Sequence, residues 1–188
     1  MHYLHRILVY IPDCCEPKTS RKEKVKEIRY YAESVTEEYE GPAFDWRETE
    51  TAGRWAYEYP QQVYFAADNI EWFEKELKDV QMIQKHEAEK CLAEIKKSVG
   101  TDLEKIYKIL SERKMYFDEQ TEKKVPGCDR YMVAYYLHHL SEILHGDYCS
   151  NSYFYDTHEI TASLYDSKIE QIKAEPQNWA LVMFDYHN

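Results

Sequence analysis

Two apolar segments at opposite ends of the chain constrain its fold more than any other feature. Arg6–Ile11 (RILVYI) ends at Pro12, and Trp179–Tyr186 (WALVMFDY) follows Pro176. Runs of this length, rich in β-branched and aromatic residues, predict buried β-strands. Because both are apolar on each face, we expect them to pair with each other, antiparallel, inside a sheet. The fold must therefore bring the first and the last strand together.

The segments between these strands are predicted to be mostly helical. A first helix is expected to begin at a capping box, formed by Thr19 or Ser20 with Glu23, and to end before Gly41. Tyr148–Tyr155 has the composition of a polar, aromatic connector. Helical spacing of apolar residues and capping signals predict further helices at about 69–99, 101–110, 129–144 and 159–173.

Alternating aromatic residues predict a β-hairpin in the segment 44–66. Trp55, Tyr57 and Tyr59 recur with a period of two and would share one face of a strand. The small residues of Thr51–Gly53 are suited to the turn.

The order of the predicted elements indicates the fold class. A strand, a helix, two strands, a helix, a helical stretch and a last strand correspond to a ferredoxin-like α+β sandwich with an antiparallel sheet. Residues 100–177 would form a helical insertion before the last strand of a single domain spanning 1–188. In the long helix the apolar stripe rotates after Val80, so its first half is predicted to pack on the sheet and its second half on the next helix.

Composition excludes several classes of protein. The chain has 35 acidic and 24 basic residues and a net charge of −11, so we expect no direct binding to nucleic acid. No apolar run is long enough to span a bilayer and the start has no signal-peptide pattern, which predicts a cytoplasmic protein that binds no membrane. Without a CxxC pair, free thiols are expected rather than a zinc site. The five cysteines are Cys14, Cys15, Cys91, Cys128 and Cys149.

The negative charge is concentrated between Glu33 and Glu74. This segment holds eleven acidic residues and two basic ones. Several tryptophans and tyrosines are interleaved with them, and the whole chain has 18 tyrosines. Such a pattern favours docking on a partner protein with a basic surface, through electrostatic steering and aromatic anchors. An acidic face that serves solubility alone is the alternative. The expected interface residues are Glu37, Glu38, Trp46, Glu48, Glu50, Arg54, Trp55 and Tyr57.

Two short motifs, FDW at 44–46 and AGRW at 52–55, resemble a hairpin of small uncharacterised phage and mobile-element proteins. In that hairpin an aromatic pair precedes GGRW, and Ala52 stands here in place of a glycine. The resemblance implies a phage-type origin but no activity. Together with the acidic segment, it suggests a non-enzymatic inhibitor, acting in the host cytoplasm, that occludes a basic surface of a nucleic-acid-handling defence complex.

Binding of a small anion is an alternative function. Five basic residues lie between Lys18 and Lys26, at the start of the first predicted helix. A helix N-terminus presents free N–H groups to anions, so Arg21, Lys22 and Lys24 could capture a nucleotide or another phosphate.

An enzyme is a further alternative, for which His158 beside Asp156 is the candidate acid–base group. No nucleophile motif or phosphate-binding loop accompanies it, so no catalytic residue is assigned. His138, Glu142 and His145 align along one helix, but on the side opposite its apolar seam, where no second helix would supply ligands. We therefore expect no metal and no cofactor.

Overall fold

The structure is a computed structural model that describes residues 1–41, 43–111, 117–118, 123–124 and 130–187. The chain divides into two units, one formed by Met1–Gln84 with His145–Asn188 and the other by Lys85–Leu144. Helix α2 (Ile70–Val99) begins in the first unit and ends in the second. Among the described helices, none combines the length and the apolar character needed to cross a membrane.

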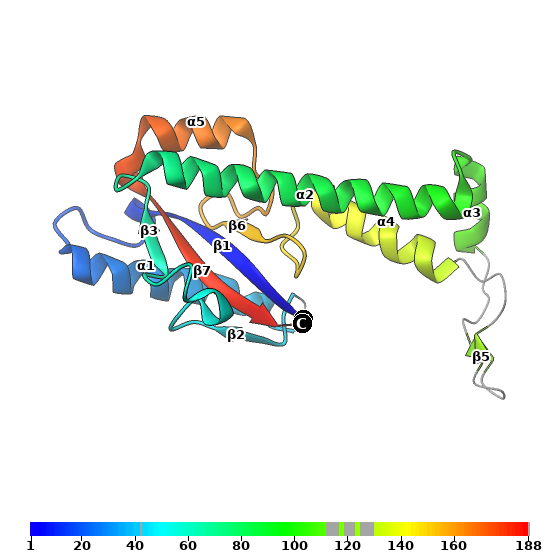
Figure 1. Cartoon of the computed structure of the whole chain (residues 1–188), viewed down its shortest axis with the longest axis horizontal. Coiled ribbons are helices and arrows are strands. Elements are labelled where there is room, and N and C mark those ends of the chain that lie inside the picture. The colour runs from blue at the N-terminus through cyan, green and yellow to red at the C-terminus, as the bar shows by residue number, and fades with distance from the viewer. Residues whose placement is uncertain (42, 112–116, 119–122, 125–129, 188) are drawn as a thin grey trace. The chain divides into compact units, whose positions relative to one another are not determined.

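The centre of the first unit is an antiparallel pair of long strands, β1 (His2–Tyr10) and β7 (Trp179–His187) (Figure 1). Their register runs without interruption from His2 opposite His187 to Tyr10 opposite Trp179. This confirms the prediction that the first and the last strand pair. Three short strands complete a five-stranded sheet: β2 (Trp46–Glu48) and β3 (Val63–Phe65), both antiparallel to β7, and β6 (Phe154–Asp156), parallel to β1.

The predicted hairpin is wrong. The strands β2 and β3 do not pair with each other but occupy successive stretches of β7, at 185–187 and 180–182. Between them, Gly53–Trp55 forms a 3-10 helix, η3, so Trp55, Tyr57 and Tyr59 share no strand face. The physical reason is that the side chains of Gln62 and Asp185 bond to the backbone of residues 49–54 and hold the segment 49–62 as a loop against β7.

The sheet also contains a strand that the sequence analysis missed. Tyr148–Tyr155 was expected to be a connector, but its end begins β6, whose three residues are too few to show a periodic pattern. Because β6 is parallel to β1, the sheet is mixed and not purely antiparallel. The fold is α+β, with five α-helices in the described residues, while the ferredoxin-like topology is not confirmed.

Helices cover both faces of this sheet (Figure 1). On one face lies α1 (Arg21–Thr36), which begins at the predicted capping box of Ser20 and Glu23. On the other face lie the first part of α2 and α5 (Asp166–Ala174). The α1-side core includes Ile7, Ile28, Ala32, Val182 and Phe184, and the α2-side core includes Leu8, Phe73, Leu77, Ile169 and Met183. Residues of β1 and β7 therefore alternate between the two cores, as the pleat requires.

The second unit contains the end of α2, α3 (Leu103–Ser111), α4 (Arg130–His145) and the paired strands β4 (Phe117–Asp118) and β5 (Lys123–Lys124). Its core confirms that the second half of α2 packs on helical neighbours. The core residues are Ile95, Val99 and Val133, with Ile106, Ile109, Leu110, Tyr136, Leu137 and Leu140 packed against them. Three leucines of these helices, Leu92, Leu103 and Leu144, are exposed although their helical spacing predicts that they face the core. The predicted start of α4 at Asp129 lies outside the described residues.

A buried ion pair crosses the α2-side core. The Nε atom of Arg6 on β1 lies 2.9 Å from Oε2 of Glu76 on α2, and both side chains are less than a tenth exposed. The Tyr59 hydroxyl donates to the same carboxylate oxygen at 3.0 Å. The three side chains therefore connect the central strand, the long helix and the loop before β3.

Replacing Arg6 by Met should destabilise the protein by about 3–5 kcal/mol, because the Glu76 carboxylate is left buried without its cation. Replacing both partners, Arg6→Met with Glu76→Leu, should restore most of the free energy of unfolding, since no buried charge remains. Urea unfolding followed by circular dichroism measures both. An Arg6→Met protein that unfolds at the wild-type urea concentration would contradict this role of the pair.

Candidate functional site

The residues predicted to bind a partner lie around β2, at one end of the sheet. In its pairing with β7, Trp46 and Glu48 lie opposite His187 and Asp185, and Arg47 lies opposite Tyr186. Directly opposed residues share a face, so Trp46 and Glu48 point to the α2 side of the sheet and Arg47 to the α1 side.

Arg47 connects β2 to the C-terminal end of α1. Its guanidinium donates to the Thr36 hydroxyl at 2.5 Å and to the Glu33 carbonyl at 2.9 Å. The same group lies 5.3 Å from the centre of the Phe44 ring. One of the two basic residues of the acidic segment is therefore used inside the fold and does not project as a free surface cation.

The side chain of Gln62 closes the loop that connects β2 to β3. Its amide nitrogen donates to the carbonyls of Thr49 (2.9 Å) and Thr51 (3.2 Å). The Gln62 backbone has a φ of 60°, and its carbonyl accepts from the amide of Met183 on β7. The two ends of the loop 49–62 are thereby held together against the sheet.

A buried carboxylate, Asp185 on β7, fixes the middle of the same loop. Its Oδ2 accepts from the Arg54 backbone N–H at 3.1 Å, and its Oδ1 lies 2.9 Å from Nδ1 of His2. Gly53 has a φ of +53°, and a Cβ atom there would lie 2.3 Å from Asp185 Oδ2. Only glycine therefore allows this close approach of the loop to β7.

The exposure of the predicted anchors differs from residue to residue. Trp46 is 48% exposed and Tyr57 98% exposed, whereas Trp55 is half-buried against the α2-side core. Glu50 and Arg54 are exposed as well. Trp46 and Tyr57 are thus available to a partner, while much of Trp55 serves to hold the loop.

Glu37 and Glu38 belong to a different part of this surface. They lie on η2 (Glu37–Tyr39), which continues α1 on the opposite side of the sheet from η3. Glu48 lies opposite Asp185, the Arg54 backbone is bonded to Asp185, and Trp46 lies opposite His187, two residues further along β7. The Glu37–Glu38 pair lies on the other side of the sheet. The predicted interface residues therefore curve around β2 and do not form one flat patch.

The negative charge of this surface is not neutralised locally. Within the described residues of 33–58, no carboxylate forms an ion pair with a lysine or an arginine. Further along the acidic segment, Asp68 and Glu74 do have basic partners. The carboxylates without a lysine or arginine partner therefore extend from the end of α1 to the loop 49–62.

The predicted anion site at the start of α1 is built differently from the expectation. Arg21 forms a two-bond ion pair with Asp68 and lies 4.4 Å from the centre of the Phe65 ring. The Ser20 hydroxyl accepts the backbone N–H of Glu23, and the Glu23 carboxylate accepts from Ser20. The carboxylates of Glu23 and Asp68 lie near the start of the helix and repel an anion there. Binding of an anion by Lys22 and Lys24 therefore stays a prediction.

The proposed acid–base residue His158 has a partner that the sequence did not indicate. Its Nδ1 lies 2.7 Å from Oδ2 of Asp13, a residue 145 positions away. The expected partner, Asp156, is buried and pairs with Lys168 at 3.1 Å. An imidazole oriented by a carboxylate is able to transfer protons, and this pair lies at the carboxyl ends of the parallel strands β1 and β6. The enzyme alternative remains a prediction.

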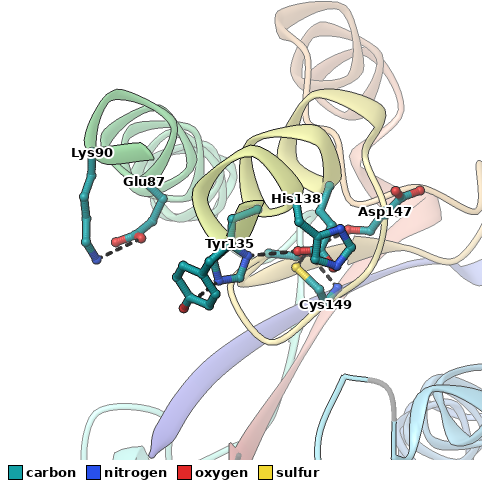
Figure 2. Close-up of polar contacts among 9 residues, drawn as sticks. Glu87, Lys90, Tyr135, His138, Asp147 and Cys149 are labelled. Carbon is teal, nitrogen blue, oxygen red and sulfur yellow. Dashed lines mark hydrogen bonds and ion pairs between the residues drawn. The ribbon is translucent and has the colours of Figure 1, made fainter. Parts of the chain in front are cut away.

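The histidines of α4 form a small polar cluster (Figure 2). The Glu142 carboxylate lies 3.3 Å from Nε2 of His138 and 2.9 Å from Nδ1 of His139. Tyr135 approaches Nε2 of His139 at 3.2 Å. In the part of the chain that the structure describes, no three histidine, cysteine or acidic residues have a metal-binding arrangement. Four cysteines are free, and Cys128 lies outside the described residues.

Part of the tyrosine excess gathers on the α1 side of the sheet. The hydroxyls of Tyr39 and Tyr155 are 3.0 Å apart, and the Tyr148 ring lies within 5 Å of both rings. Beneath them, Nδ1 of the fully buried His5 lies 3.0 Å from the Tyr148 hydroxyl, and its Nε2 lies 3.0 Å from the Ser150 carbonyl. Because a carbonyl can only accept, Nε2 carries the proton and Nδ1 accepts from Tyr148.

Comparison with known proteins adds no relative: no protein-family model, no curated protein and no solved structure matches this chain. The resemblance to phage and mobile-element proteins therefore stays a prediction, and a function has to be argued from the geometry above.

Trp46 should be the tryptophan most accessible to solvent. Acrylamide quenching of the fluorescence should decrease more on Trp46→Phe than on Trp55→Phe, because Trp55 is half-buried and Trp179 is not exposed at all. Acrylamide is preferred to iodide, since the acidic surface repels an anionic quencher. A larger decrease on Trp55→Phe would contradict the packing described here.

The stability of the protein should depend on pH through His5. Burial lowers the pKa of His5 from 6.5 to about 3, so the unfolded chain binds a proton on this residue below pH 6.5 while the folded protein does not. The free energy of unfolding should therefore fall, by up to about 1.4 kcal/mol per pH unit, as the pH drops from 6.5 towards 3. Urea unfolding at pH 7, 6 and 5 should show a shallower decline for His5→Gln than for the wild type. Equal slopes would show that His5 is not buried in its neutral form.

Proposed function

We propose that this chain is a non-enzymatic binding protein that occludes a basic surface of a partner protein. The observation that carries the proposal is the pair of exposed aromatic side chains, Trp46 and Tyr57, set among carboxylates that have no lysine or arginine partner within the described residues of 33–58. The proposed contact surface is the α2 side of β2 with the loop 49–62, and the Glu37–Glu38 pair extends it around the edge of the sheet.

The construction of the loop supports this role. Gln62 and Asp185 hold the loop 49–62 in one conformation before any partner arrives. A surface that is already ordered loses little conformational entropy on binding, so more of the contact energy appears as affinity. Buried aromatic anchors contribute about 2 kcal/mol or more each, while the surrounding carboxylates speed the encounter with a basic surface.

In its most specific form, the partner is a nucleic-acid-handling complex and the protein is a phage-type inhibitor of host defence. Lysine and arginine side chains that bind phosphates also bind carboxylates, so an acidic surface is able to occupy a nucleic-acid site without binding nucleic acid itself. The net charge of −11 and the resemblance of the FDW and AGRW motifs support this version.

Charge reversal tests the proposal. Glu48→Lys with Glu50→Lys should abolish capture of partner proteins from an extract of the native host at physiological salt, as measured by mass spectrometry. The control, Glu71→Lys with Glu89→Lys, changes the net charge equally at exposed positions on α2 and should capture the same proteins as the wild type. The pair Glu37→Lys and Glu38→Lys reports whether the partner also reaches the α1 side.

Thermal unfolding should show that all three variants are folded. A triple variant combines Glu48→Lys, Glu50→Lys and Trp46→Ala. If it captures the same proteins as the wild type, the surface around β2 is not the interface.

A further inference from the structure

An open pocket of about 430 Å³ lies against the tyrosine cluster of the first unit. This volume is within the range of small-molecule sites in proteins. The rings of Tyr39, Tyr148 and Tyr155 line it, and Ile160, which is 72% exposed, lies at its rim. The face of an aromatic ring carries partial negative charge, so three such rings favour a cation over an anion.

Two carboxylates add formal negative charge to the same pocket. Glu38 and Asp147 belong to its lining, which includes no lysine, arginine or histidine among the residues that the structure describes. Neither carboxylate has an ion-pair partner among the residues that the structure describes. A bound cation would therefore meet tyrosine side chains and carboxylates without an ion-pair partner in the described residues.

The backbone that carries Asp147 is fixed. The Ser152 hydroxyl donates to the Asp147 carbonyl at 2.9 Å and accepts from the Cys149 amide at 3.0 Å. Gly146, which precedes Asp147, has a φ of +75°, and a Cβ atom there would lie 2.4 Å from the Thr161 hydroxyl. This wall of the pocket is therefore preformed.

Most groups beneath the pocket are uncharged. His5, under Tyr148, is neutral at physiological pH, and burial raises the pKa of both Tyr148 and Tyr155, so the tyrosines keep their protons. Arg47 is a cation that acts on Tyr148 from behind, but its guanidinium is bonded to α1 and does not belong to the lining. The two carboxylates of the lining, Glu38 and Asp147, outnumber this one positive charge.

We propose that this pocket binds an organic cation of the alkylammonium class. The three tyrosines enclose its apolar substituents, and Glu38 and Asp147 balance its charge. The group is either the head of a free quaternary amine or the end of a lysine side chain on a peptide. The inference does not depend on the proposed function, because the pocket lies on the α1 side of the sheet and the loop 49–62, at the centre of the proposed contact surface, lies on the other side. Glu38 belongs to both surfaces.

Titration of the isolated protein with choline chloride, followed by NMR of the tyrosine rings, tests the site. Choline should produce saturable shifts, and its neutral isostere 3,3-dimethylbutan-1-ol should bind at least about tenfold more weakly. A short peptide with one trimethyl-lysine, titrated in parallel, identifies the source: the tighter of the two ligands is the one for which the pocket is shaped. The proposal would be overturned if neither choline nor the peptide produced saturable shifts. Equal affinity for choline and its neutral isostere would also overturn it.

Matched variants separate a cation site from mere packing. Tyr39→Phe keeps the ring and should bind as the wild type does, whereas Tyr39→Leu and Asp147→Asn should each weaken binding about fivefold to tenfold. Glu37→Gln removes a neighbouring carboxylate outside the lining and should have no effect. Unchanged affinity in both Tyr39→Leu and Asp147→Asn would refute the site. The Glu48–Glu50 reversal should leave choline binding intact, so failure of either proposal is recognised independently of the other.

Discussion

The pairing of β1 with β7 is the interaction on which the rest of the first unit depends. All nine residues of each strand take part, and every other strand of the sheet attaches to one of the two. Because β1 and β7 are far apart along the chain, the sheet is incomplete until both are present. Contacts so distant in the sequence form late and slowly in folding. The elements between them then acquire a surface against which to pack.

The alternation of side chains along β7 supports two different surfaces. Tyr186 lies on the α1 side, within the core next to the tyrosine cluster, and Asp185 lies on the α2 side, where it holds the loop 49–62. A slip of one residue in the β1–β7 register would exchange these two faces, so the register specifies both the candidate interface and the pocket. Arg6, on the neighbouring strand, is paired with Glu76 only in this register, since it must point into the α2-side core.

The parts of the fold that were predictable are those that local patterns determine. The two long strands, the capping box at Ser20 and the rotation of the apolar stripe in α2 all follow from neighbours in the sequence. The hairpin prediction failed because Gln62 and Asp185 satisfy the backbone of the loop 49–62 through side chains, which alternation of aromatic residues does not reveal. The Asp13–His158 contact and the pocket join segments more than a hundred residues apart, so no spacing in the chain indicates them.

The distribution of cations explains why the acidic surface stays acidic. Arg6 and Lys168 are buried and neutralised by Glu76 and Asp156, so these four charges contribute little to the outer field. Arg47 differs, because it donates hydrogen bonds to a hydroxyl and a carbonyl, and its charge therefore persists on the α1 side of the sheet. There it offsets part of the field of the Glu37–Glu38 pair at the end of α1. The loop 49–62 holds one basic residue, Arg54, which is exposed and forms no ion pair with Glu48 or Glu50. These two carboxylates therefore stay without a lysine or arginine partner among the described residues. They lie near the exposed Trp46 on β2, where steering and anchoring of a basic partner would act together.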